Sequence, residues 1–171
     1  MKFRKSKMPP DEVFSIFQDS TQTAFQFLVS DFAFRLDSIV VDDSLAQIQL
    51  IACRVRYRNE TTEVTIIYDW YEDLRGAPQV ICGRLTRDET GALIVDEAFN
   101  LDMLIAEKCP DKSIRAFSKD PIERIKQTLD SYGAIMAECA NDELTGDFTI
   151  FTRLRTTLLD EMKGAVILTR N

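Results

Sequence analysis

The sequence contains no histidine among its 171 residues. Histidine is the side chain whose ordinary pKa lies closest to neutral pH, so its absence removes the usual centre of catalytic triads, many metal sites and simple proton shuttles. Glycine-rich phosphate loops of the G-x-G-x-x-G and G-x-x-x-x-G-K types are also missing, as is a D-x-D-x-D-G calcium loop. The sequence therefore favours a binding protein over an enzyme and predicts neither a cofactor nor a metal site.

Long apolar runs are missing as well. The stretch 48–53 is interrupted by Gln49 and falls far short of the roughly 20 apolar residues that span a bilayer. The basic start of the chain is followed at 9–12 by two prolines and two acids, where a signal peptide would have an apolar segment. We therefore expect a cytoplasmic protein that does not bind the membrane.

The chain has four cysteines, and their spacing fits no common paired motif. The four cysteines lie far apart, and no two of them form the C-x-x-C pair of a zinc knuckle or a redox-active dithiol; they are Cys53, Cys82, Cys109 and Cys139. A nucleophilic cysteine usually needs a neighbouring base, and no imidazole can supply one here. We expect four reduced and mostly buried thiols.

Positive charge is concentrated at the start of the chain. The net charge is −7, yet Lys2, Arg4, Lys5 and Lys7 all precede the first acidic residue. The rest of the chain is therefore strongly acidic, which opposes binding to nucleic-acid phosphates and anionic lipid and speeds the encounter with basic proteins. We expect residues 1–8 to be a disordered basic arm, and the partner to be a basic protein.

The length and the 45% hydrophobic content fit one domain, 1–171, with an ordinary core. Acidic residues at 11 and 12 suit a helix N-terminus, and apolar residues then recur at steps of three and four. This pattern predicts an amphipathic helix over 11–29. Its apolar positions include Val13, Phe17, Ala24 and Leu28.

The middle of the chain changes to a period of two. Apolar residues alternate with polar ones over 51–58 and 63–70, which predicts an antiparallel hairpin with one buried face. A loop at 60–61 would place Arg58 opposite Glu63, whereas a loop at 59–60 would place Arg56 there. Both registers bury the same side chains, so the sequence does not choose between them.

Three more strands are expected, over 34–41, over 80–87 and, after a turn at 88–91, over a short segment at 92–95. If the strand at 51–58 extended back to Leu50, this side chain would lie on the opposite face from the other apolar residues. We therefore expect a bulge or burial on both faces near Leu50. The last third is again helical, with helices expected over 101–108, over 121–140 behind the cap of Asp120, and from Phe151 onward. The fold class is α+β: an N-terminal helix, an antiparallel four- or five-stranded meander sheet, and C-terminal helices packed on the sheet.

Acidic residues are densest just after the predicted hairpin, around Trp70. Three carboxylates could hold a cation or divide acid and base roles, but their spacing fits no known pattern of this kind. The cluster is either a solvated strand end or a surface for another protein, and we take the second as the hypothesis. The predicted contact residues are Asp69, Tyr71, Glu72 and Asp73. The outward stripe of Arg54, Arg56 and Arg58 is expected to pair with acids across the sheet.

Several segments in this order resemble small bacterial proteins grouped with the immunity proteins of polymorphic toxin systems. They are residues 32–35 (FAFR), 54–57 (RVRY), 64–69 (VTIIYD), 81–85 (ICGRL) and 144–148 (LTGDF). The resemblance implies a catalytically inert, acidic, cytosolic protein that neutralises a toxin by occupying its surface.

Two other functions remain open. One is an acidic secretion chaperone, which would form a stable dimer with an apolar groove for an unfolded client. The other is an enzyme that uses carboxylates or Cys82 alone. Whether the protein is a monomer or a homodimer is open at this point.

Overall fold

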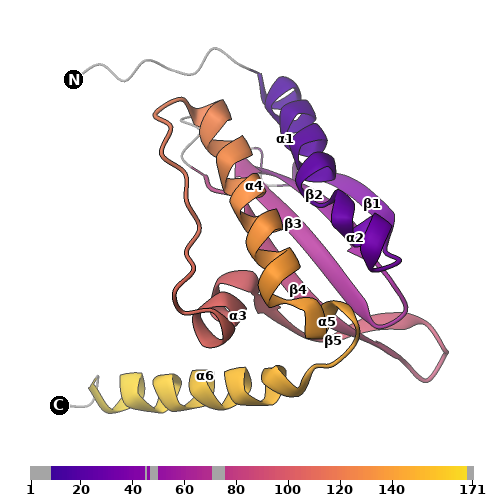
Figure 1. Cartoon of the computed structure of the whole chain (residues 1–171), viewed down its shortest axis with the longest axis vertical. Helices are drawn as coiled ribbons and strands as arrows, with labels where there is room; N and C mark the ends of the chain where they lie inside the picture. The colour runs from indigo at the N-terminus through magenta and orange to yellow at the C-terminus, as the bar shows by residue number, and fades with distance from the viewer. Residues whose placement is uncertain (1–8, 45, 47–49, 71–75, 169–171) are drawn as a thin grey trace.

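The protein is a five-stranded antiparallel sheet with its helices on one face (Figure 1). The computed structural model describes residues 9–44, 46, 50–70 and 76–168. The strands follow one another across the sheet in the order β1-β2-β3-β4-β5. The predicted α+β class, with a meander sheet between an N-terminal helix and C-terminal helices, is confirmed. The predicted basic arm, 1–8, lies outside the described residues.

The strands lie close to the predicted segments, except where a bulge interrupts the alternation of side chains. They are β1 (Arg35–Asp42), β2 (Ile51–Arg58), β3 (Thr62–Trp70), β4 (Gln79–Arg87) and β5 (Leu93–Asn100). The last strand is longer than the predicted 92–95, because a bulge at Asp96 breaks the alternation that the prediction relied on. A second bulge lies at Asp37 in β1. Leu50, where an irregularity was expected, borders residues that are not described.

The β2–β3 hairpin adopts the first of the two registers that the sequence allowed. Arg58 lies opposite Glu63, and its Nε donates to Glu63 Oε2 at 2.7 Å. The side chain of Asn59 accepts from the backbone N–H groups of Thr61 and Thr62, at 2.9 and 2.8 Å. These bonds shape the two-residue loop at 60–61, so a side chain inside the turn fixes what the alternating pattern left open.

The N-terminal helix is divided, and the prediction of one helix over 11–29 is wrong in this respect. Helix α1 (Pro10–Ala24) and helix α2 (Gln26–Asp31) meet at Phe25, whose φ of −108° and ψ of 16° lie outside the helical range. The N–H of Leu28 bonds to the carbonyl of Phe25 at 3.0 Å, a tighter turn than that of an α-helix. The change of direction lets Phe25 and Leu28 both be fully buried.

The C-terminal half contains helices α3 (Leu101–Lys108), α4 (Pro121–Cys139), α5 (Asn141–Leu144) and α6 (Thr149–Leu168). Asn100 caps α3, and Asp120 caps α4 by accepting from the N–H groups of Ile122 and Glu123, both at 3.0 Å. Glu123 forms an ion pair with Lys126 at 3.0 Å. The local signals that predicted these helices are therefore real caps.

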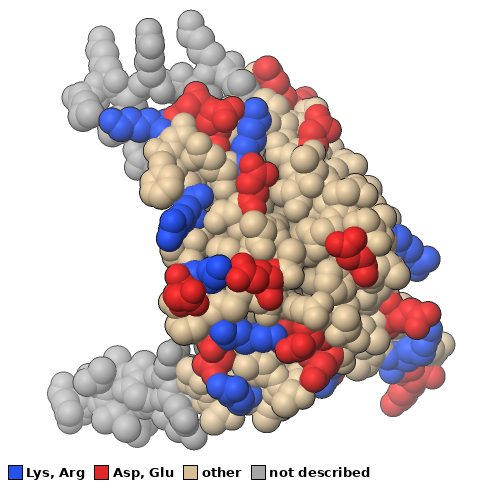
Figure 2. Space-filling model, in the orientation of Figure 1, with Lys and Arg blue, Asp and Glu red and all other residues tan. Residues whose placement is uncertain are grey.

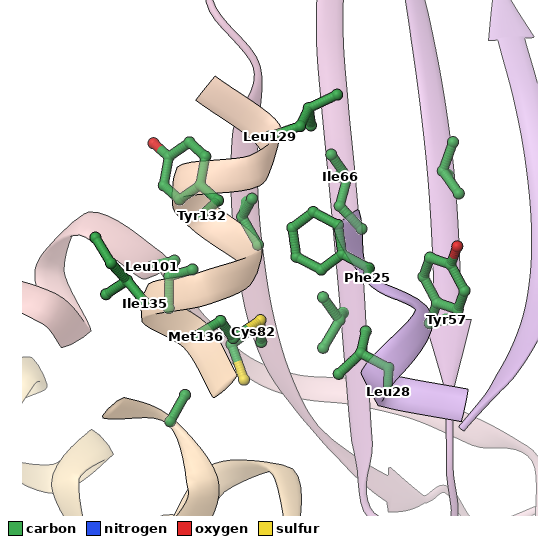
Figure 3. Close-up of a cluster of buried hydrophobic side chains, with 14 of the residues drawn as sticks. Phe25, Leu28, Tyr57, Ile66, Cys82, Leu101, Leu129, Tyr132, Ile135 and Met136 are labelled. Atoms are coloured by element: carbon green, nitrogen blue, oxygen red, sulfur yellow. The ribbon is translucent and has the colours of Figure 1, made fainter. Parts of the chain in front are cut away.

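The core lies between the sheet and helices α1, α2 and α4 (Figure 3). Phe17 of α1 packs on Tyr68 of β3 with ring centroids 5.5 Å apart. Phe25 and Leu129 face Ile66 in the middle of the sheet (Figure 3). Helices cover only one face of the sheet, so the alternate side chains of β2 and β3 are left on the other face.

At Gly133, α4 lies very close to the end of α1. A Cβ at this position would lie 2.3 Å from the carbonyl oxygen of Ala24. In an exposed helix, Gly→Ala is stabilising by up to about 1 kcal/mol, but here the added methyl must push two backbones apart. We expect Gly133→Ala to destabilise the protein by about 1 to 3 kcal/mol in denaturant titrations. Asp130→Ala on the exposed face of α4 is the control, and a stabilised Gly133→Ala variant would contradict the prediction.

Candidate protein-binding surface

The predicted contact residues are only partly described. Asp69 is half-buried and lies in β3 on the face that the helices leave open. Tyr71, Glu72 and Asp73 lie outside the described residues, so their predicted role stays a prediction. Across the sheet, Asp69 pairs with Ala52 and Ala52 pairs with Asp42. Two carboxylates thus flank a small apolar residue at one end of the open face.

Helices α1 and α4 also begin at this end of the molecule (Figure 1), and each carries acidic residues at its start. Figure 2 shows red side chains over the upper end, with blue ones among them. We call this set of acidic residues the acidic end: Asp11, Glu12, Asp42, Asp43, Asp69, Asp120 and Glu123. Hydrogen bonds from Ser44 and Arg54 lower the pKa of Asp42 to about 2. Lys119 is also exposed here, while Arg54 and Lys126 form ion pairs with members of the set.

The arginine stripe of β2 is occupied by ion pairs, as the sequence predicted. Arg54 lies 3.0 Å from Asp42, and Arg56 and Arg58 lie 3.5 and 2.7 Å from Glu63. The carboxylate of Glu63 also accepts from Thr65 Oγ1 at 2.9 Å and is nearly buried among these side chains. Because these guanidinium groups already have carboxylate partners, the stripe is a poor site for phosphates.

Cys82, the candidate nucleophile, is fully buried in β4. Burial raises the pKa of its thiol, and the nearby carboxylate of Glu143 raises it further. A thiol in this setting stays protonated and out of reach of a substrate. Within the described part of the chain, no three His, Cys, Asp or Glu side chains are placed to share a metal ion.

The prediction of four reduced cysteines is wrong for two of them. Cys109 and Cys139 form a disulfide, with their Cα atoms 6.4 Å apart, whereas Cys53 and Cys82 are free and buried. Cys109 follows the last residue of α3, and Cys139 is the last residue of α4. The two cysteines are 30 positions apart in sequence, and their bridge links the C-terminal ends of two helices. No local sequence pattern indicates that these ends lie close together.

Glu143 is a buried carboxylate that the sequence gave no reason to single out. Its side chain is 1% exposed, and both of its oxygens accept from Lys108 Nζ, at 3.1 and 3.0 Å. The same ammonium group reaches Asp142 at 3.1 Å. The backbone carbonyl of Glu143 accepts from Thr62 Oγ1 at 2.8 Å. These bonds join α3 and α5 to the sheet, which is a structural role.

Strand β1 forms an edge of the sheet and is poorly covered by the helices. Three of its side chains point to the helix side yet remain exposed, namely Leu36 (42%), Ile39 (38%) and Val41 (48%). Val40, on the open face, is 44% exposed. The apolar run 39–41 helped to predict the strand, but no local feature of the sequence indicated that the strand would lie at the edge of the sheet.

A depression of about 980 Å³ lies beside the β2–β3 turn. Its lining combines basic and acidic side chains, among them Arg35, Arg58, Asp31 and Glu60. Asn59 also lines it and donates to the carbonyls of Phe32 and Leu144, at 3.4 and 3.1 Å. Since its charges are mixed and Arg58 is bonded to Glu63, the depression favours no particular ligand.

Comparison with protein families, curated proteins and solved structures finds no match for this chain. The described helices are all too short or too polar to cross a bilayer. Function must therefore be argued from the geometry above.

Proposed function

We propose that this chain is a non-catalytic protein-binding module that inhibits a basic toxin domain by covering its surface. The observation that carries the proposal is the open face of the sheet, which the helices leave free and which carries Asp42 and Asp69 at one end. An inhibitor of this kind needs a surface of complementary shape and charge, and it needs no nucleophile or cofactor. The resemblance to immunity proteins supports the same function and a bacterial, cytoplasmic setting.

Asp69 is the described residue best placed to lie in the contact. On the open face, Ala52 lies beside it, and Ile67, two residues earlier on the same strand, is half-buried. Protein interfaces commonly combine such an apolar centre with a polar rim. The surrounding carboxylates would attract a basic partner and raise its association rate, an effect that weakens as salt is added.

The first test is to identify the partner. The tagged chain is used for affinity pull-down from the native host, and mass spectrometry identifies what is retained. Recovery of one basic toxin domain at a stoichiometric level would support the proposal. Recovery of no basic protein would contradict it.

The second test measures the contact surface with that partner. The variant Asp69→Ala/Tyr71→Ala/Glu72→Ala/Asp73→Ala is expected to bind at least about tenfold more weakly, a loss typical of central contact residues, and to fold normally. Asp69→Lys should weaken binding more than Glu89→Lys, which makes the same charge change in the exposed β4–β5 turn. Calorimetry provides the affinities. Unchanged affinity in the four-residue variant would remove these residues from the contact.

A secretion chaperone is the second candidate, and the exposed apolar side chains of β1 favour it. Such a protein would bind unfolded clients through apolar surface. The pull-down separates the two functions, because a chaperone would retain several secreted proteins of varied sequence. An enzyme is disfavoured by the buried thiol of Cys82. An ion or metabolite retained by the purified protein would reopen that possibility.

A further inference from the structure

The sheet has two edge strands, and they differ in how well they are protected. Edge strands present unpaired backbone groups to other chains, and proteins usually blunt them with charge, proline, bulges or covering elements. On β5, the bulged Asp96 and the adjacent Glu97 form ion pairs with Arg84 and Arg155. Helix α6 also packs on this strand, with Phe151 against Phe99 at 4.8 Å. The edge at β5 is therefore charged and partly covered.

The edge at β1 lacks most of this protection. Asp37 and Asp42 form ion pairs with Arg58 and Arg54 of β2, but the apolar run 39–41 between them contains no charge or proline, and the bulge at Asp37 lies before it. Leu36, Ile39 and Val41 are exposed on the helix side, and Val29 of the neighbouring α2 is 42% exposed. These side chains would be covered if another strand were added to the edge.

We propose that β1 pairs antiparallel with β1 of a second copy, about a two-fold axis that passes through Ile39. In this register each Ile39 faces the Ile39 of the second copy, and Ser38 faces Val40. Beyond the bulge, which is skipped here as it is in the pairing with β2, Leu36 faces Val41. Every pair then joins side chains that lie on the same face of the sheet.

Charge selects this register over its neighbours. The same alignment places Arg35 of each copy opposite Asp42 of the other, where it would share the carboxylate with Arg54 of that copy, so both ends of the paired strands carry opposite charges. Within its own sheet, Arg35 lies opposite another cation, Arg58. A two-residue shift that centred the axis on Val40 would pair Ser38 with Asp42 and leave both Arg35 side chains without an acid across the interface. A one-residue shift would mix the two faces.

The resulting dimer is a continuous sheet of twice the width, with the helices of both copies on the same face. The axis is perpendicular to the sheet, so the two acidic ends lie at opposite ends of the assembly. Each Asp69 is separated from the new interface by β2 and remains accessible. The inference thus goes beyond the proposed function and does not depend on it.

The mass of the intact chain in solution tests the inference. We expect sedimentation at tens of micromolar to give a dimer for the native chain and a monomer, or at least a tenfold higher dimer Kd, for Ile39→Lys. The control is Ile94→Lys, which makes the same change on β5 at a similar exposure of 44%. A monomeric native chain would overturn the inference. A dimer that survives Ile39→Lys would overturn it as well.

Cysteine cross-linking tests the register without a charged substitution. Ile39→Cys should form a covalent dimer under mild oxidation, because residues directly opposite in an antiparallel pair have Cβ atoms only about 5 Å apart. Val41→Cys should not, because the second copy's Val41 lies opposite Leu36. Cys53 and Cys82 are buried and should not compete. Cross-linking through Val41→Cys but not through Ile39→Cys would exclude the register.

Discussion

Replacing Lys108 by methionine is expected to destabilise the protein by about 3 to 5 kcal/mol, because removing one partner of a buried ion pair leaves the other charge uncompensated. Glu143 is 1% exposed, and both of its carboxylate oxygens depend on Lys108 Nζ. Chemical denaturation of the single variant measures the loss.

Two further variants separate the ion pair from simple packing. Lys108→Met/Glu143→Leu should recover most of the stability, because an apolar pair of similar volume often replaces a buried ion pair at no net cost. Lys112→Met removes a lysine of an exposed pair with Glu138 and should cost less than about 1 kcal/mol. If Lys108→Met behaved like Lys112→Met, Glu143 would have to be solvated and the structural role given to the pair would be wrong.

Loss of the disulfide is expected to have an effect of similar size. The Cys109–Cys139 bridge closes a loop of 30 residues, for which the chain-entropy relation gives a stabilisation of between about 3 and 4 kcal/mol. Cys109→Ala/Cys139→Ala should therefore unfold at a lower denaturant concentration than the oxidised protein. Adding a reductant should shift the native chain by a similar amount and leave the double variant unchanged. If the reductant also lowered the stability of the double variant, its effect would have to come from groups other than this disulfide.

The bridge also bears on the compartment. Disulfides persist in oxidising compartments and are rare in the cytoplasm, whereas the proposed function places this chain in the cytoplasm. Thiol trapping in the native host distinguishes the two. Trapping of Cys109 and Cys139 as free thiols would agree with a cytoplasmic protein. Their protection until reductant is added would move the proposed inhibitor to an oxidising compartment.

Local signals in the sequence were sufficient for most of the fold. Alternation gave strands β2 and β3, and the cap at Asp120 gave the start of α4. The break at Phe25 was not predictable, because it follows from the burial of Phe25 and Leu28 under the rest of the molecule. The bulge at Asp96 hid half of β5 for a related reason, since it removes the period by which a strand is recognised.

From the sequence, the candidate site could be predicted only as a group of acidic residues that are close together in the chain. The sequence located acidic residues near Trp70, and the structure adds that Asp69 shares an end of the sheet with Asp42 and with the starts of α1 and α4. Contacts between residues distant in sequence, such as Lys108 with Glu143, leave no local pattern. The exposure of β1 depends on which strand occupies the edge of the sheet, and alternation along a single strand carries no such information.

The close contact of α1 with α4 at Gly133 joins two helices that leave the ribosome at different times. Each strand of the meander follows its neighbour along the chain, so a ribosome that has released residues up to Asn100 has delivered the whole sheet. Helix α4 has not yet emerged, and the apolar face that it covers is protected only by α1 and α2. All five strands can therefore leave the ribosome before the helix that completes their core, and their apolar face is then open to general chaperones.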